Sequence, residues 1–136
     1  MDIELVAHAL AYSAVGIVVL LVGFFVLDLL TPGSLGQLVM DRNPNAAVLS
    51  SGILVALGLV MWFAIFFSDP GWDGLDDAAV FGVVGVVAQA AGFVALDLII
   101  PGRLAAITEE PTLHPAAFVA AAGQIAVALI VAAALT

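Results

Sequence analysis

Four apolar stretches, each close to the length that a lipid bilayer requires, constrain this chain more than any other feature. They lie at roughly 7–30, 45–67, 77–100 and 115–135, and a helix needs about 20 apolar residues to cross the hydrocarbon core. Charged residues make up 10% of the chain, whereas soluble domains carry about 25%. The sequence therefore predicts an all-α membrane protein, a bundle of four transmembrane helices whose main partner is the lipid bilayer.

The charge balance and the residue types that are missing exclude several functions. Eleven acidic residues face only Arg42 and Arg103, for a formal net charge of −9. A nucleic-acid partner is excluded because it requires a basic surface. The chain has no cysteine, and it shows no phosphate-binding glycine loop, histidine–glutamate metal cluster or nucleophile with a base. We expect no enzymatic activity, no metal and no cofactor.

Proline motifs mark the expected helix ends. Proline cannot continue a helix, but it suits the first helical position after a capping residue. The motifs are Thr31-Pro32-Gly33 after the first stretch, Asn43-Pro44 before the second and His114-Pro115 before the fourth. The first helix starts after an acidic segment, unlike a signal peptide, and is expected to be retained.

An acidic turn at 68–77 separates the second and third stretches. Trp72 lies there at the height of an interfacial anchor. His8 and Tyr12 lie one helical turn apart near the start of the first helix. They either sense pH or pair with the acids of residues 68–76, or they serve as interface anchors.

The two halves of the chain align with each other. The matches are Val15-Gly16-Ile17 with Val84-Gly85-Val86, Leu27-Asp28-Leu29 with Leu96-Asp97-Leu98, Pro32-Gly33 with Pro101-Gly102, and Asn43-Pro44 with His114-Pro115. We interpret residues 1–136 as one integral membrane domain, with repeat one at about 7–67 and repeat two at about 77–136. The bundle is then expected to have pseudo-two-fold symmetry.

The repeat also predicts the topology. Each copy crosses the membrane twice, so both copies enter from the same side and the repeats are parallel. Arg42 and Arg103 then lie on one face, which the positive-inside rule makes cytoplasmic. We expect a multi-pass protein of the plasma (inner) membrane with both termini extracytoplasmic.

Motifs around the first loop resemble a known family. They are Thr31-Pro32, Gln37-Leu38-Val39, Asn43, Ala46-Ala47 and Ser51-Gly52. The chain is similar over nearly its whole length to the YjfL-like inner-membrane proteins, a domain of unknown function (DUF 350). The second copy departs from the pattern, with Ile100 in place of threonine and His114 in place of asparagine. The resemblance implies a four-helix membrane protein connected with envelope-stress systems, and it implies no reaction.

Asp28 and Asp97 are the leading candidates for a functional site, because an ionisable group in a membrane span is costly unless hydrated or paired. Each lies about one turn before a proline. In one reading they line a cytoplasmic vestibule that binds a cation or relays a proton. In the other they are interfacial acids that reach water or pair with Arg42 and Arg103.

Gln89 and Gln124 lie inside the third and fourth stretches. They either form hydrogen bonds between helices or line a pore. Their repeat counterparts are Leu20 and Ile53, which argues against a symmetric site. Small residues at four-residue spacing in the third stretch favour that helix as the central packing element.

Residues after each proline have helical spacing, namely Leu35, Leu38 and Val39, and Leu104 and Ile107. They predict either a short interfacial helix or an ordered loop. The sequence leaves two functions open. One is an accessory or scaffold protein that binds other envelope membrane proteins. The other is an ion, proton or small-solute pathway that uses Asp28 and Asp97. We expect a homo-oligomer, which four short helices would need to form a pore.

Overall fold

The structure, a computed structural model, describes residues 2–31, 33–100 and 104–135. Four helices in it are long and apolar enough to cross a membrane, as predicted. The elements in chain order are α1 (Ile3–Leu29), α2 (Leu35–Met40), α3 (Pro44–Phe66), the 3₁₀ turn η1 (Gly71–Gly74), α4 (Leu75–Ile99), the 3₁₀ turn η2 (Leu104–Glu109) and α5 (Ala116–Leu135).

Capping side chains fix where the helices begin. The Asp2 carboxylate accepts a hydrogen bond from the Glu4 N–H, so α1 starts before the predicted apolar span. Asn43 caps α3, with Pro44 at its first position. At about 1.5 Å per residue, a 27-residue helix such as α1 is roughly 40 Å long, more than the roughly 30 Å of a bilayer core. It must therefore tilt or project beyond the core.

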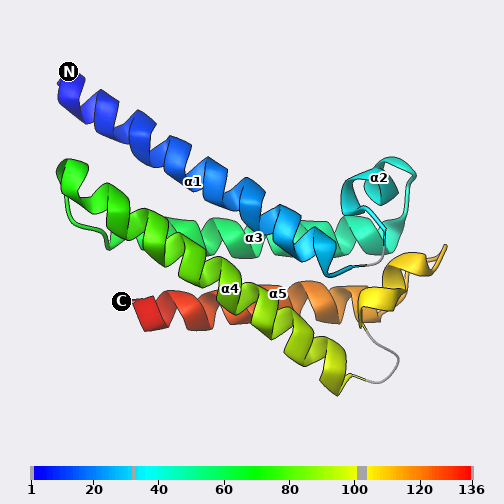
Figure 1. Cartoon of the computed structure of the whole chain (residues 1–136). Coiled ribbons are helices and arrows are strands. Elements are labelled where there is room, and N and C mark those ends of the chain that lie inside the picture. The colour runs from blue at the N-terminus through cyan, green and yellow to red at the C-terminus, as the bar shows by residue number, and fades with distance from the viewer. Residues whose placement is uncertain (1, 32, 101–103, 136) are drawn as a thin grey trace.

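Both chain ends lie at one end of the bundle, as Figure 1 shows. The turn η1 lies at the same end, which we call the terminal end. The elements α2 and η2 lie at the opposite end, which we call the loop end. Both halves therefore cross in the same direction and have the same order of a long helix, a short element and a long helix. The duplication of one ancestral unit stays a prediction.

Helix α3 is the central element of the bundle. It packs against α1, α4 and α5, and half of its apolar window is buried. Helix α4 also contacts the other three long helices, but only 28% of its window is buried. Residues 77–100 therefore take a central packing position, as predicted, but α3 is the more deeply buried helix.

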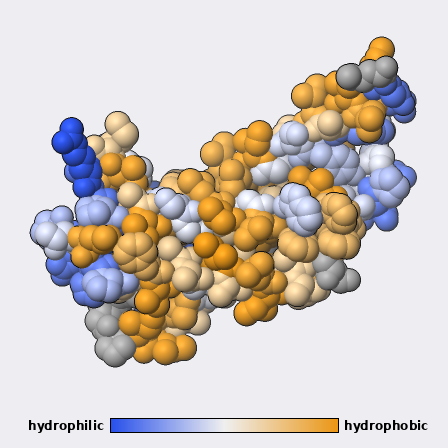
Figure 2. All heavy atoms as spheres, turned by 180° about the vertical axis from the view of Figure 1, so that it is seen from behind, coloured by the Kyte–Doolittle hydropathy of each residue, from blue (hydrophilic) through white to orange (hydrophobic). Residues whose placement is uncertain are grey.

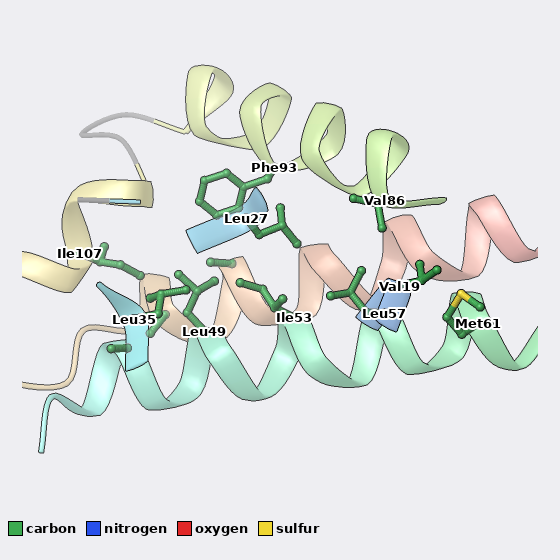
Figure 3. Packing of buried hydrophobic residues seen from close by; sticks show 13 residues of the cluster. Val19, Leu27, Leu35, Leu49, Ile53, Leu57, Met61, Val86, Phe93 and Ile107 are labelled. Atoms are coloured by element: carbon green, nitrogen blue, oxygen red, sulfur yellow. The ribbon is translucent and has the colours of Figure 1, made fainter. Parts of the chain in front are cut away.

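The row of large side chains on α3 forms the core. Leu49, Ile53, Leu57 and Met61 repeat at four-residue spacing and therefore share one face. Figure 3 shows this row facing side chains from the neighbouring elements, namely Leu27, Phe93, Val86 and Val19. Leu35 of α2 and Ile107 of η2 close the row at the loop end.

The closest helix contact joins α3 and α5. A Cβ added to Gly52 would lie only 2.6 Å from both the Cα and the Cβ of Ala121. A glycine is therefore required here for the two backbones to approach. Such close packing is a main source of helix association in lipid, because apolar burial gives no net driving force there.

The outer surface matches a membrane environment. In Figure 2, hydrophilic residues gather at the two ends of the visible face and apolar residues cover the belt between them. Many large apolar side chains of the long helices are exposed, including Leu98, Ile99 and Ile130. The chain is therefore a multi-pass membrane protein.

The packing departs from strict two-fold symmetry. Such symmetry would match the contact between α3 and α4 with one between α5 and α1. In the structure α1 packs on α3 and α4, and its contact with α5 is marginal at most. The order of the elements is compatible with the predicted pseudo-two-fold symmetry but these contacts are not, and the repeat stays a prediction.

Candidate functional site

Polar side chains of the apolar spans lie at three levels of the bundle. Asp28, Asp97 and the residues around Asn43 lie near the loop end. Gln89 and Gln124 lie inside the bundle, and both are fully buried. His8 and Tyr12 lie near the terminal end, on the first part of α1. Each level has its own hydrogen-bond pattern.

Asp28 holds the short helix α2 to the end of α1. One carboxyl oxygen accepts a hydrogen bond from the Leu35 N–H at 2.6 Å. The Asp28 carbonyl accepts another from the Thr31 hydroxyl at 2.9 Å. Leu35 is the first residue of α2 and is fully buried. The carboxylate thus satisfies one of the N–H groups that a helix start leaves unpaired.

The two sequence-predicted acids differ in exposure. Asp28 is half-buried, whereas Asp97 is only 5% exposed. Asp97 also has an interaction partner. Arg42 is exposed and adopts a left-handed backbone conformation, with φ of 65°. The structure pairs the Asp28 carboxylate with a backbone N–H. The motif residues Pro32, Pro101 and Arg103 lie outside the described residues.

Asn43 ties the two halves together as well as capping α3. Its side-chain oxygen accepts from the Ala46 N–H at 3.0 Å, and its amide nitrogen donates to the carbonyl of Thr108 at 2.8 Å. His114 occupies the matching place before α5. Its Nδ1 accepts from the Ala116 N–H at 3.0 Å, and its side chain is exposed. Both residues cap, but only the asparagine reaches the other half.

Asn45 forms a clamp that the sequence analysis missed. Its amide nitrogen donates to the carbonyls of Ile107 at 3.1 Å and Thr112 at 2.8 Å. Its oxygen accepts from the His114 N–H at 2.7 Å. Asn45 is fully buried. The contrast with its repeat counterpart, Ala116, could have identified it. A polar residue that is present in only one copy indicates a contact that only this copy makes.

Gln89 joins α4 to the backbone of α5. In the amide orientation that satisfies both of its polar atoms, its nitrogen donates to the Gln124 carbonyl at 3.1 Å and to Gln124 Oε1 at 2.7 Å. Its oxygen accepts from the Ala128 N–H at 2.9 Å. The two glutamines therefore form hydrogen bonds between helices, which is one of the two predicted alternatives.

Two buried polar atoms near the bundle core have no hydrogen-bond partner among the described residues. They are Gln124 Nε2 and the Ser50 hydroxyl oxygen. The neighbouring Ser51 hydroxyl instead donates to the Ala47 carbonyl at 2.8 Å. Unpaired buried donors cost stability. In the Gln89–Gln124 pair, the side-chain amide of Gln124 therefore keeps one polar atom without a hydrogen bond to any described residue.

At the terminal end, α1 holds the loop that follows α3. The Tyr12 hydroxyl lies 2.7 Å from the carbonyl of Gly71 and 3.1 Å from that of Asp69. The His8 ring meets the Trp72 ring edge to face, with centroids 4.4 Å apart. The observed partners of His8 and Tyr12 therefore lie in the expected loop, and that of His8 is a tryptophan ring and not an acid. For Tyr12 they are backbone carbonyls and not the acid side chains.

The described residues contain no group of three histidine, aspartate or glutamate side chains that could hold a metal ion. His8 and His114 lie at opposite ends of the bundle, so they cannot share an ion within one protomer. The polar groups described above connect helices and loops to one another. We call these hydrogen bonds within one protomer structural ties.

Comparison with known proteins gives the family. The model of a family described as Domain of Unknown Function (DUF350) matches residues 1–135. The chain belongs to the DUF350 family. This agrees with the resemblance in the first loop, and it carries no assigned reaction.

Relatives of this DUF350 chain are transmembrane proteins by their names. A UPF0719 transmembrane protein of Mycolicibacterium paratuberculosis is 45% identical over 128 residues, which cover 92% of this chain and 84% of the relative. A UPF0719 transmembrane protein of Mycobacterium bovis is 44% identical over 133 residues, covering 96% and 88%. No solved structure matches.

Proposed function

We propose that this DUF350 chain is a non-enzymatic accessory or scaffold protein, which binds other envelope membrane proteins and conducts nothing. One observation carries the proposal. Polar groups of the spans are used to join parts of the same protomer, as Asp28 does with Leu35 and Gln89 with Gln124. A pathway for ions needs polar groups that are free to replace water around the ion.

The surfaces between the helices support the same reading. A groove of about 410 Å³ between α1 and α4 is lined by seven valines and Ala90. It offers no polar group to a hydrated ion or a polar solute. The exposed apolar belt leaves room for contact with other membrane helices, including a second copy of this chain. We therefore include self-association and placement in the inner membrane, with both termini extracytoplasmic, in the proposal.

One observation favours the second candidate, an oligomeric pathway. Asp97 is an acid at 5% exposure within the apolar span of α4, and such residues often mark ion routes. In that case Asp97, together with Asp28, would contribute to a vestibule shared between protomers.

Ion flux in proteoliposomes tests the choice. We expect the wild-type chain to leak no more H⁺, Na⁺ or K⁺ than protein-free vesicles do. Flux above that level, lost in the Asp28→Asn/Asp97→Asn double variant at matched incorporation, would overturn the scaffold proposal in favour of the pathway. A reporter fused after Thr136 tests the orientation, because activity in the cytoplasm would contradict it.

A further inference from the structure

A small pocket at the terminal end has a chemical character that the structural ties do not explain. It has a volume of about 280 Å³ and lies between α1, the end of α3 and the loop that follows α3. Its lining includes the aromatic residues Tyr12 and Phe66. Ser68, Asp69 and Gly71 contribute polar groups. It is separate from the apolar groove between α1 and α4.

The pocket offers hydrogen-bond acceptors. The Tyr12 hydroxyl proton is directed at the carbonyls of Gly71 and Asp69. The Ser68 hydroxyl donates to the carbonyl of Ile65 at 2.7 Å. A carbonyl oxygen has two lone pairs, and a hydroxyl that donates can still accept. The Asp69 side chain only accepts when it is ionised. The polar side chains and these carbonyls therefore suit a ligand that donates, and they disfavour an anion.

The aromatic residues favour a cation in the same place. Rings of tyrosine and phenylalanine attract an ammonium group through their negative faces. Phe66 is 65% exposed on the bundle surface. Its ring stacks on that of Trp62, with centroids 5.1 Å apart and planes 13° apart. Tryptophan and tyrosine are enriched at the height of lipid headgroups in membrane proteins, and Trp62 and Tyr12 are neighbours of this kind, on the ring of Phe66 and in the pocket lining.

We propose that this pocket binds the primary ammonium group of an ethanolamine lipid headgroup. The ammonium donates to the carbonyls of Asp69 and Gly71 and to the Asp69 carboxylate, in the pocket that Tyr12 and Phe66 also line. A primary ammonium is required because the carbonyls need an N–H donor. A quaternary choline group has none. The lipid is the source because the pocket opens beside lipid-facing aromatic residues.

Native mass spectrometry of the full-length chain tests the proposal. The protein is released from vesicles of equal parts phosphatidylethanolamine and phosphatidylglycerol, and the retained lipids are counted. We expect a preference for ethanolamine lipid of roughly three- to five-fold, as a cation beside aromatic residues and a carboxylate would give. Asp69→Asn should abolish the preference, and Phe66→Leu should reduce it.

Asp73→Asn is the matched control. It removes the same charge from the same loop, but Asp73 does not line the pocket. Asp69 is exposed, and its backbone carbonyl makes the contact with Tyr12. The substitution should therefore leave the fold intact, which unchanged amide exchange of residues 71–74 verifies.

Four outcomes would overturn the proposal. The first is equal retention of the two lipids by the wild type. The second is the same loss in Asp73→Asn as in Asp69→Asn. The third is equal preference when phosphatidylcholine replaces phosphatidylethanolamine, which would remove the N–H donor from the argument. The fourth is displacement of the lipid by free ethanolammonium chloride at equal concentration, which would identify a soluble amine as the occupant.

Discussion

Helices α1 and α4 hold equivalent places in the two halves of the sequence but different places in the bundle. Helix α4 contacts all three other long helices, whereas α1 packs on α3 and α4. Gln89 of α4 reaches the backbone of α5. Its counterpart on α1 is Leu20, which is half-buried against the core. One polar substitution between the copies thus coincides with a change in how the helix packs.

The connecting segments of the two halves differ in the same way. Helix α2 is held by Asp28, which belongs to its own half. The segment around η2 is held by Asn43 and Asn45 from the other half. The second half has His114 and Ala116 where these asparagines stand. The comparison teaches that the second loop depends on the first half, whereas among the described residues the first loop shows no such hydrogen bonds to the second half.

Asn45→Ala should break this dependence and have the largest effect. It removes donors for the carbonyls of Ile107 and Thr112 and an acceptor for the His114 N–H. Leaving buried polar groups unpaired costs about 1–3 kcal/mol each, so we expect a loss of roughly 2–4 kcal/mol in the unfolding free energy. Titration with denaturing detergent in mixed micelles measures it.

The control for this variant is Asn43→Ala, which removes a cap and the bond to Thr108 and should cost less, about 1–2 kcal/mol. Amide exchange of residues 107–114 should accelerate in Asn45→Ala, while that of α2 stays unchanged. Equal acceleration at both segments would contradict the one-way dependence.

Equivalent glycines sharpen the comparison of α3 with α5. Gly52 meets the backbone of Ala121, whereas its counterpart Gly123 meets the end of the flexible Leu96 side chain. Gly52→Ala should therefore destabilise the bundle by about 1–3 kcal/mol, and Gly123→Ala by less than about 1 kcal/mol. Gly58→Ala, with open space around it, should be neutral. Similar values at Gly52 and Gly58 would exclude a tight contact between the backbones of α3 and α5.

Substitutions of the buried glutamines should give a smaller and unequal effect. Gln89→Leu removes bonds to Gln124 and to the Ala128 N–H. We expect a loss of about 0.6–1.7 kcal/mol, the range for such bonds in membranes. Gln124→Leu also removes the unpaired Nε2, so it should cost less than Gln89→Leu. The opposite order in thermal unfolding would show that Gln124 has a partner that the present contacts do not include.

Hydropathy was sufficient to predict the four spans, because length and apolar character alone decide whether a helix crosses lipid. The start of α3 was also predictable, since Asn43-Pro44 carries its own capping chemistry. The arrangement of the helices was not. Their faces are apolar toward both lipid and protein, so hydropathy does not say which face of α1 meets α4.

The site residues show the same limit. Sequence indicated that Gln89 would bond to another helix, because a buried amide needs a partner. It could not show that the partners are Gln124 and the backbone N–H of Ala128, both on α5. Asn45 was missed because its partners lie more than 60 residues away and are backbone groups, which leave no trace in the sequence.

The central claim is that polar groups in the spans are structural ties, and Asp28 tests it most directly. Asp28→Asn keeps an oxygen that can accept from the Leu35 N–H but cannot carry a proton, whereas Asp28→Leu has no acceptor. We measure the unfolding free energy of both variants. The account predicts that Asp28→Asn stays within about 1 kcal/mol of the wild type and that Asp28→Leu loses about 1–3 kcal/mol. Unchanged stability in Asp28→Leu would contradict it.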